Sequence, residues 1–139
     1  MKDLFIDDHL PNRLKECTNM TGKLTTHVLD TSIGKPAIGL LVELWKYHSP
    51  TEEFVKICEE KTNGQGRLNQ PLLEGEALES GRYELLFHVA AYFDEMGIIQ
   101  DNPPFLNVVP ISFGIANKLE HYHVPLLIAP GGYSTYRGS

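Results

Sequence analysis

Four polar groups in the sequence are of the types needed for acid–base chemistry and for binding polar molecules. They are His27, Arg67, the pair His121 and His123, and the last four residues, Tyr136-Arg137-Gly138-Ser139. A histidine exchanges protons near neutral pH because its unperturbed pKa is about 6.5. A guanidinium presents a planar fork of N–H donors that forms two parallel hydrogen bonds. These groups favour a hydrolysis in which histidine activates a water molecule.

The sequence lacks the common signatures of covalent hydrolases. It has no Gly-x-Ser-x-Gly run, in which a nucleophilic serine would stand at a sharp strand-to-helix turn. Neither Cys17 nor Cys58 has the context of a catalytic cysteine, and no pair of acidic residues resembles that of a glycosidase. Water is therefore the expected nucleophile.

The spacing of His121 and His123 also permits a metal site. Residues two apart on a strand point the same way, and His-x-His pairs occur in zinc sites. His27 could supply a third ligand, so a zinc-dependent hydrolase using these three histidines is one alternative. No further ligand has a metal-binding spacing near the pair, and the cysteines are not in Cys-x-x-Cys form. We therefore expect neither a metal nor another cofactor.

Short alternating segments separated by turn residues must position these groups. The expected strands span residues 23–29, 38–47, 54–60, 83–89, 109–115, 122–128 and 133–136, with one short helix at 90–96. The second of these strands is nearly continuous in apolar residues, as if buried on most of both faces. This pattern predicts an all-β fold, a two-sheet β-sandwich of seven to eight strands with one short helix. His27 would lie on the first strand and Arg67 after a glycine-rich turn.

Bulk composition limits the class of protein. The chain has 139 residues, 42% of them apolar, which fits one domain with its own core. A net charge of −6 argues against a nucleic-acid partner. No segment approaches the roughly 20 apolar residues of a membrane span, and acidic residues occupy the start where a secretory signal needs an apolar stretch. We expect a cytoplasmic protein with free thiols at Cys17 and Cys58.

Residues 1–21 read as a polar N-terminal extension or linker, with a possible short helix at 10–17, and residues 22–139 as the domain. Within the domain, three blocks resemble the 5-hydroxyisourate hydrolases of the transthyretin-related family. They are Leu24-Thr25-Thr26-His27-Val28-Leu29-Asp30, Thr62-Asn63-Gly64-Gln65-Gly66-Arg67, and the segment from His121 to Ser139. The resemblance covers about residues 22–139 and implies the transthyretin-like (prealbumin-type) sandwich.

The resemblance also implies roles for individual residues. His27, Arg67, His123 and Ser139 match catalytic positions, and Arg67, Tyr136, Arg137, Gly138 and Ser139 match positions that bind substrate or shape its pocket. His121 then becomes a bystander, and either His27 or His123 could be the general base. Many relatives have an acid before the Gly-Arg of the turn, where this sequence has Gln65.

The reaction implied is the hydrolytic opening of the cyclic amide of 5-hydroxyisourate at N1–C6. The product is 2-oxo-4-hydroxy-4-carboxy-5-ureidoimidazoline, an intermediate of urate catabolism. The family implies a homotetramer, a dimer of dimers, with active sites at subunit interfaces, and we expect residues 133–139 there. The alternative without catalysis is a transthyretin-like carrier of small molecules, which should lack the polar set given above.

Overall fold

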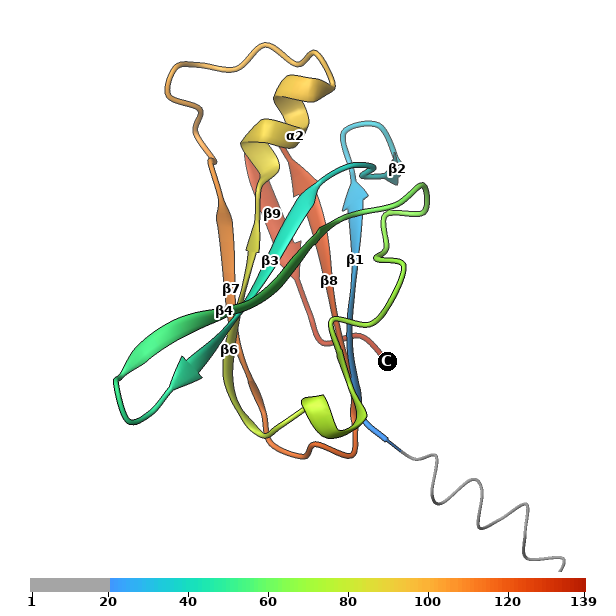
Figure 1. Cartoon of the computed structure of the whole chain (residues 1–139). Coiled ribbons are helices and arrows are strands. Elements are labelled where there is room, and N and C mark those ends of the chain that lie inside the picture. Colours follow the sequence, from blue (N-terminus) through green and yellow to red (C-terminus); the bar gives the residue numbers. More distant parts are fainter. Residues whose placement is uncertain (1–20) are drawn as a thin grey trace, which may run out of the picture.

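The computed structural model describes residues 21–139, which form two β-sheets packed face to face with one short α-helix at one end (Figure 1). The strands are β1 (Lys23–Asp30), β2 (Lys35–Pro36), β3 (Leu41–His48), β4 (Glu53–Lys61), β5 (Leu73–Glu74), β6 (Gly81–Phe87), β7 (Val109–Ile115), β8 (His121–Ala129) and β9 (Gly132–Thr135). The helices are η1 (Gly75–Ala77), a single 3-10 turn, and α2 (Val89–Glu95). The all-β sandwich predicted from alternation is confirmed.

The two sheets have the strand orders β2-β1-β8-β9, with β5 also paired to β1, and β4-β3-β6-β7. Strands β1 and β8 run parallel, whereas every other strand pair within residues 21–139 is antiparallel. The parallel register places Thr25 opposite His123 and Lys23 opposite His121. Residues far apart in the sequence therefore become neighbours on the first sheet.

Period-two alternation decides which face of the first sheet is buried. On β1, Leu24 and Val28 are fully buried against the second sheet, and on β8 Leu126 and Ile128 are buried with them. Side chains of consecutive strand residues point to opposite faces. The odd-numbered residues of β1 and the two histidines of β8 therefore lie on the outer face of the sheet, away from the core.

A buried carboxylate ties the end of β1 to α2. Asp30 is 1% exposed, and its Oδ2 accepts a hydrogen bond from the hydroxyl of Tyr92 at 2.8 Å. The backbone N–H of Ser32 donates to Oδ1 at 3.0 Å. Burial and the adjacent carboxylate raise the pKa of Tyr92 above its usual range, so the phenol stays a donor. The helix is thereby fixed over one end of the first sheet.

Three local predictions from the sequence differ from the structure. Strand β3 begins at Leu41 instead of residue 38. It is covered on one face only, because Val42 and Leu44 are buried while their neighbours in the strand are half-buried. Strand β6 ends at Phe87, and Val89 opens the helix with its side chain still buried. The two-residue strands β2 and β5 were not predicted because such short pairings leave no periodic pattern.

The helix considered at residues 10–17 and the thiol of Cys17 lie outside the described residues. Cys58 is half-buried in β4, and burial raises the pKa of its thiol. No helix within residues 21–139 is long and apolar enough to cross a membrane.

Candidate functional site

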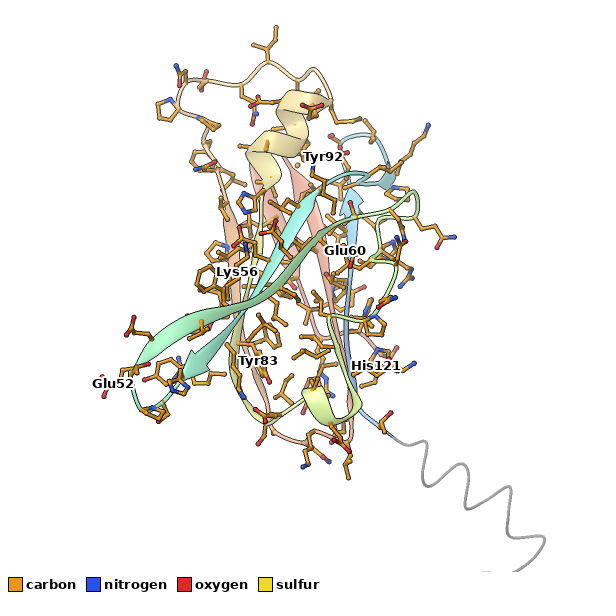
Figure 2. All side chains as sticks on the ribbon, viewed as in Figure 1. Glu52, Lys56, Glu60, Tyr83, Tyr92 and His121 are labelled. Atoms are coloured by element: carbon orange, nitrogen blue, oxygen red, sulfur yellow. The ribbon has the colours of Figure 1, made fainter. Side chains whose placement is uncertain are left out.

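A cavity of about 290 Å³ opens on the outer face of the first sheet. Its walls come from Thr25 and Thr26 of β1, the loop from Arg67 to Pro71, His121 and His123 of β8, and Ser139. Figure 1 shows the C-terminus beside β1, and Figure 2 labels His121 in the same region. Four parts of the chain thus surround one space.

The hydroxyl of Thr25 joins the two histidines of β8. Its Oγ1 lies 2.8 Å from Nδ1 of His123 and 2.9 Å from Nε2 of His121. The parallel register of β1 and β8 makes this contact possible because it brings Thr25 directly beside His123. The remaining ring nitrogen of His123, Nε2, has no hydrogen-bond partner among residues 21–139, so it is free to act on a molecule in the cavity.

His27 is held in a defined tautomer by the arginine turn. Its Nε2 lies 2.9 Å from the backbone oxygen of Gln65. A carbonyl oxygen only accepts hydrogen bonds, so Nε2 must carry the proton and Nδ1 of the neutral ring is the acceptor. Gly66 packs against the same ring, and a Cβ at position 66 would lie 3.3 Å from Cδ2 of His27. Both contacts fix the plane of the imidazole.

The side chain of Asn63 organises the turn that presents Arg67. Its Oδ1 accepts hydrogen bonds from the backbone N–H groups of Gln65 at 2.8 Å and Arg67 at 3.2 Å. Gly66 takes a positive φ of 76°, which glycine adopts without strain. The guanidinium of Arg67 is exposed and makes no hydrogen bond within residues 21–139, which leaves its donors available to a ligand.

The positive charge of Arg67 changes the acidity of the histidines. Burial lowers the pKa of His123, and the charges of Arg67, His121 and His27 lower it further. Burial also lowers the pKa of His27, and Arg67 adds to this effect, while the hydrogen bond to Gln65 partly offsets it. Both rings are therefore neutral at pH 7 and able to accept a proton.

The C-terminal segment is divided between two hollows. The backbone of Gly138 donates a hydrogen bond to the oxygen of His123 at 2.8 Å, and Ser139 reaches the cavity. Arg137 instead pairs with Glu120 at 2.9 Å and covers the ring of Tyr122.

Arg137 and Tyr136 line a separate hollow between β7 and β9. The structure thus brings Arg67, His121, His123 and Ser139 together, with His27 close to Arg67, and places Tyr136 and Arg137 outside this cavity.

The zinc arrangement considered from the sequence has no cluster to support it. Within residues 21–139 no three side chains of histidine, cysteine, aspartate or glutamate converge on a point that could hold a metal ion. Two of the three candidate ligands, His121 and His123, each have one ring nitrogen within hydrogen-bond distance of Thr25.

Comparison with known proteins gives the chain a family. The model of the HIUase/Transthyretin family matches residues 24–138, which is most of the described structure. The chain belongs to the HIUase/Transthyretin family. The match includes both histidine strands, the arginine turn and Gly138.

Curated and solved members of the HIUase/Transthyretin family are similar over nearly the same range. The 5-hydroxyisourate hydrolase of Halalkalibacterium halodurans is 53% identical over 120 residues, covering 86% of this chain and 100% of the relative. The solved Klebsiella pneumoniae 5-hydroxyisourate hydrolase has a TM-score of 0.68 at 37% identity and covers 85% of this chain and 94% of its own. An (S)-allantoin synthase structure has a TM-score of 0.81 at 42% identity, but this chain matches only 44% of it.

Sequence reasoning missed three residues that build the site. Thr25 looked like an ordinary strand threonine, and its role depends on a pairing between strands almost 100 residues apart. Asn63 stands in the glycine-rich turn, and an asparagine that bonds the backbone two residues on is a recognised turn motif. Gln65 contributes its backbone oxygen, which no side-chain pattern could reveal.

Proposed function

We propose that this protein hydrolyses 5-hydroxyisourate to 2-oxo-4-hydroxy-4-carboxy-5-ureidoimidazoline, a step of urate catabolism. The observation that carries the proposal is one cavity lined by His123, Arg67 and Ser139, in a chain 53% identical to a 5-hydroxyisourate hydrolase across that relative's whole length. The transthyretin-like carrier is disfavoured because the cavity walls are polar and titratable.

In the proposed mechanism, Nε2 of His123 removes a proton from water, and the resulting hydroxide adds to the C6 carbonyl of the substrate. We assign the base to His123 instead of His27 because His123 lines the cavity and its Nε2 has no hydrogen-bond partner among residues 21–139, whereas His27 is not among the lining residues. When the C6–N1 bond breaks, Nε2–H of His123 can return a proton to N1. A positioned proton transfer of this kind contributes roughly 10²- to 10⁴-fold to rate.

Arg67 binds the substrate and stabilises the transition state. Its guanidinium fork matches paired carbonyl and N–H edges of a urate-like ring. Its charge offsets the negative charge that develops on the attacked oxygen. Ser139 supplies a hydroxyl to the same cavity for the substrate or the water. His27 lies beside Arg67, whose charge lowers its pKa, and we assign it the role of supporting the arginine turn that presents Arg67 to the substrate.

We also propose the homotetramer of the family, with residues 133–139 at a subunit interface. Strand β9 forms one edge of the first sheet and β7 forms one edge of the second, and both line a common hollow. Unpaired edges are commonly covered by association. Tyr133 and Tyr136 are 46% and 60% exposed in the single chain, and burying them would remove apolar surface from water. Light scattering on the purified protein should give four times the mass of one chain, and a monomer would contradict this proposal.

A coupled assay tests the activity. Urate oxidase generates 5-hydroxyisourate in situ, and its absorbance decay is followed with and without the protein. We expect accelerated decay that Arg67→Ala and His123→Ala both lose. The matched control is His48→Ala, which removes an exposed histidine at the end of β3 and should leave the rate unchanged. Decay no faster than the spontaneous reaction, from folded protein, would refute the assignment.

A further inference from the structure

The hydroxyl of Thr25 stands between two imidazoles in a geometry that permits proton transfer. One hydroxyl hydrogen can be donated to only one neighbour, while the oxygen accepts from the other. The distances of 2.8 Å to Nδ1 of His123 and 2.9 Å to Nε2 of His121 are both hydrogen-bond distances. The tautomers of the two rings are therefore coupled through this one group.

Two arrangements of the hydrogens satisfy these contacts. In the first, Nδ1–H of His123 donates to Thr25, whose hydroxyl donates to Nε2 of His121, and Nε2 of His123 is a free acceptor. In the second, every hydrogen bond is reversed, and Nε2 of His123 carries a proton. Only the first can take a proton from water, and only the second has one to give while the ring is neutral.

We propose that Thr25 and His121 form a proton relay with His123, so that the positive charge made when water is deprotonated moves from His123 to His121. This inference rests on the proposed hydrolase function and adds a role for His121, which the sequence alone left as a bystander.

The relay moves protons without gaining or losing any. An O–H bond of water breaks, its proton joins Nε2 of His123, and the hydroxide adds to C6. The Nδ1 proton of His123 passes to Oγ1 of Thr25 while the hydroxyl proton passes to Nε2 of His121. His123 is then neutral with a proton on Nε2, and His121 is the cation. When Nε2 of His123 gives its proton to N1 of the substrate, the hydroxyl proton of Thr25 returns to Nδ1 of His123 and the Nε2 proton of His121 returns to Oγ1 of Thr25, so both rings end neutral.

Electrostatics explain why the charge should leave His123. Burial lowers the pKa of His123, and Arg67, His121 and His27 lower it further, so an imidazolium there is disfavoured beside the substrate-binding guanidinium. His121 is exposed, so water can solvate a cation at that position until the proton returns through Thr25 to His123.

Charged groups around His121 are largely paired with one another. Lys23, its neighbour across the parallel register, lies 3.7 Å from Glu74. Arg137 donates to the backbone oxygen of His121 at 3.2 Å and pairs with Glu120. Arg67 and His123 line the same cavity as this ring. Lys23 and Arg137 each have a carboxylate partner, which weakens their repulsion of a positive charge on His121.

The first test compares two substitutions of one side chain. Thr25→Val keeps the shape of threonine but removes the hydroxyl, whereas Thr25→Ser keeps the hydroxyl. We expect kcat to fall by about tenfold or more in the valine variant and to stay near the wild-type value in the serine variant. Equal activity of the two variants would overturn the relay. Circular dichroism and thermal unfolding verify that both fold.

The second test separates a relay from mere orientation of His123. His121→Ala should lower kcat at an unchanged KM, and added imidazole should restore part of it, because the exposed position admits a small base. His48→Ala serves again as the matched histidine control. If His121→Ala is fully active while Thr25→Val is not, the hydroxyl only orients His123 and the relay is refuted.

A readout independent of turnover distinguishes failure of the relay from failure of the hydrolase assignment. Imidazole ¹⁵N shifts report which ring nitrogen is protonated. We expect the tautomers of His121 and His123 to change together during a pH titration of the wild type, and separately in Thr25→Val. Independent titration in the wild type would overturn the coupling. Coupled titration in a protein that does not accelerate decay of 5-hydroxyisourate would instead refute only the assigned reaction.

Discussion

Gly138 lies against the imidazole of His123 so closely that a Cβ at position 138 would stand 2.6 Å from Cδ2 of the ring. The backbone N–H of the same glycine donates a hydrogen bond to the backbone oxygen of His123 at 2.8 Å. The C-terminal segment therefore sets the position of the proposed base, and the absence of a side chain is what allows the contact.

Gly138→Ala should impair catalysis more than folding. The added methyl group must displace either the ring of His123 or the segment that carries Ser139, and misplacement by about 1 Å can cost on the order of 10²-fold in rate. We expect kcat/KM to fall by about tenfold or more with a melting temperature close to that of the wild type. Gly131→Ala is the matched control because nothing lies within 4 Å of its added Cβ. Wild-type activity of Gly138→Ala would show that the contact does not matter.

Gly66→Ala should reduce stability as well as activity. Position 66 has a φ of 76°, and an added Cβ would lie 2.4 Å from the backbone oxygen of Val28. Strain of this kind costs about 1–3 kcal/mol. Urea unfolding should show that loss in the free energy of unfolding, and Gly64→Ala, which meets nothing within 4 Å, should change little. A fully stable Gly66→Ala protein would contradict the close packing of the turn on β1.

Arg67→Gln should shift the titration of both site histidines toward higher pH. The guanidinium lowers the pKa of His27 and of His123, so its removal raises both values. In the wild type the neutral, base-competent rings should persist below pH 6.5, and in the variant they should become protonated at a higher pH. An NMR titration of the imidazoles measures this directly. Arg82→Gln, an exposed arginine of β6, is the control for a general change in charge. No shift would show that Arg67 lies too far away to act.

Tyr92→Phe should destabilise the fold without touching the cavity. The phenol donates to the buried carboxylate of Asp30 at 2.8 Å, and its loss leaves that carboxylate short of a donor. Removing one partner of such a buried hydrogen bond costs about 1–3 kcal/mol. Denaturant unfolding should detect the loss, while KM stays unchanged. The matched variant is Tyr47→Phe, because the hydroxyl of Tyr47 makes no hydrogen bond within residues 21–139. If both variants lost the same free energy of unfolding, the hydrogen bond between Tyr92 and Asp30 would not stabilise the fold.

The strands were predictable because their alternation is local. Val109 to Ile115 and Tyr122 to Ile128 follow period two over seven residues, and both became strands at those positions. The start of β3 was not predictable in this way, since Ile38 belongs to an apolar run but is 58% exposed in a loop. An apolar run limits where a strand can lie but does not fix its first residue.

The convergence of the candidate site was predictable only through the family resemblance. Nothing local in the sequence says that β1 and β8 are parallel neighbours, so the approach of His123 to Thr25 could not be derived from spacing. The separation of Arg137 from the cavity is likewise a tertiary effect, because Glu120 and Tyr122 bind its guanidinium. Side chains near a site in sequence can thus be drawn away by partners elsewhere.

The parallel pairing of β1 and β8 has a consequence for how activity is acquired. Thr25 and His123 are separated by 98 positions in the chain, so their contact closes a loop that spans most of the domain. The β3–β4 hairpin, by contrast, joins neighbouring segments and can form early. During refolding, turnover should therefore return no sooner than this distant closure, and enzymatic activity reports the completion of the native topology.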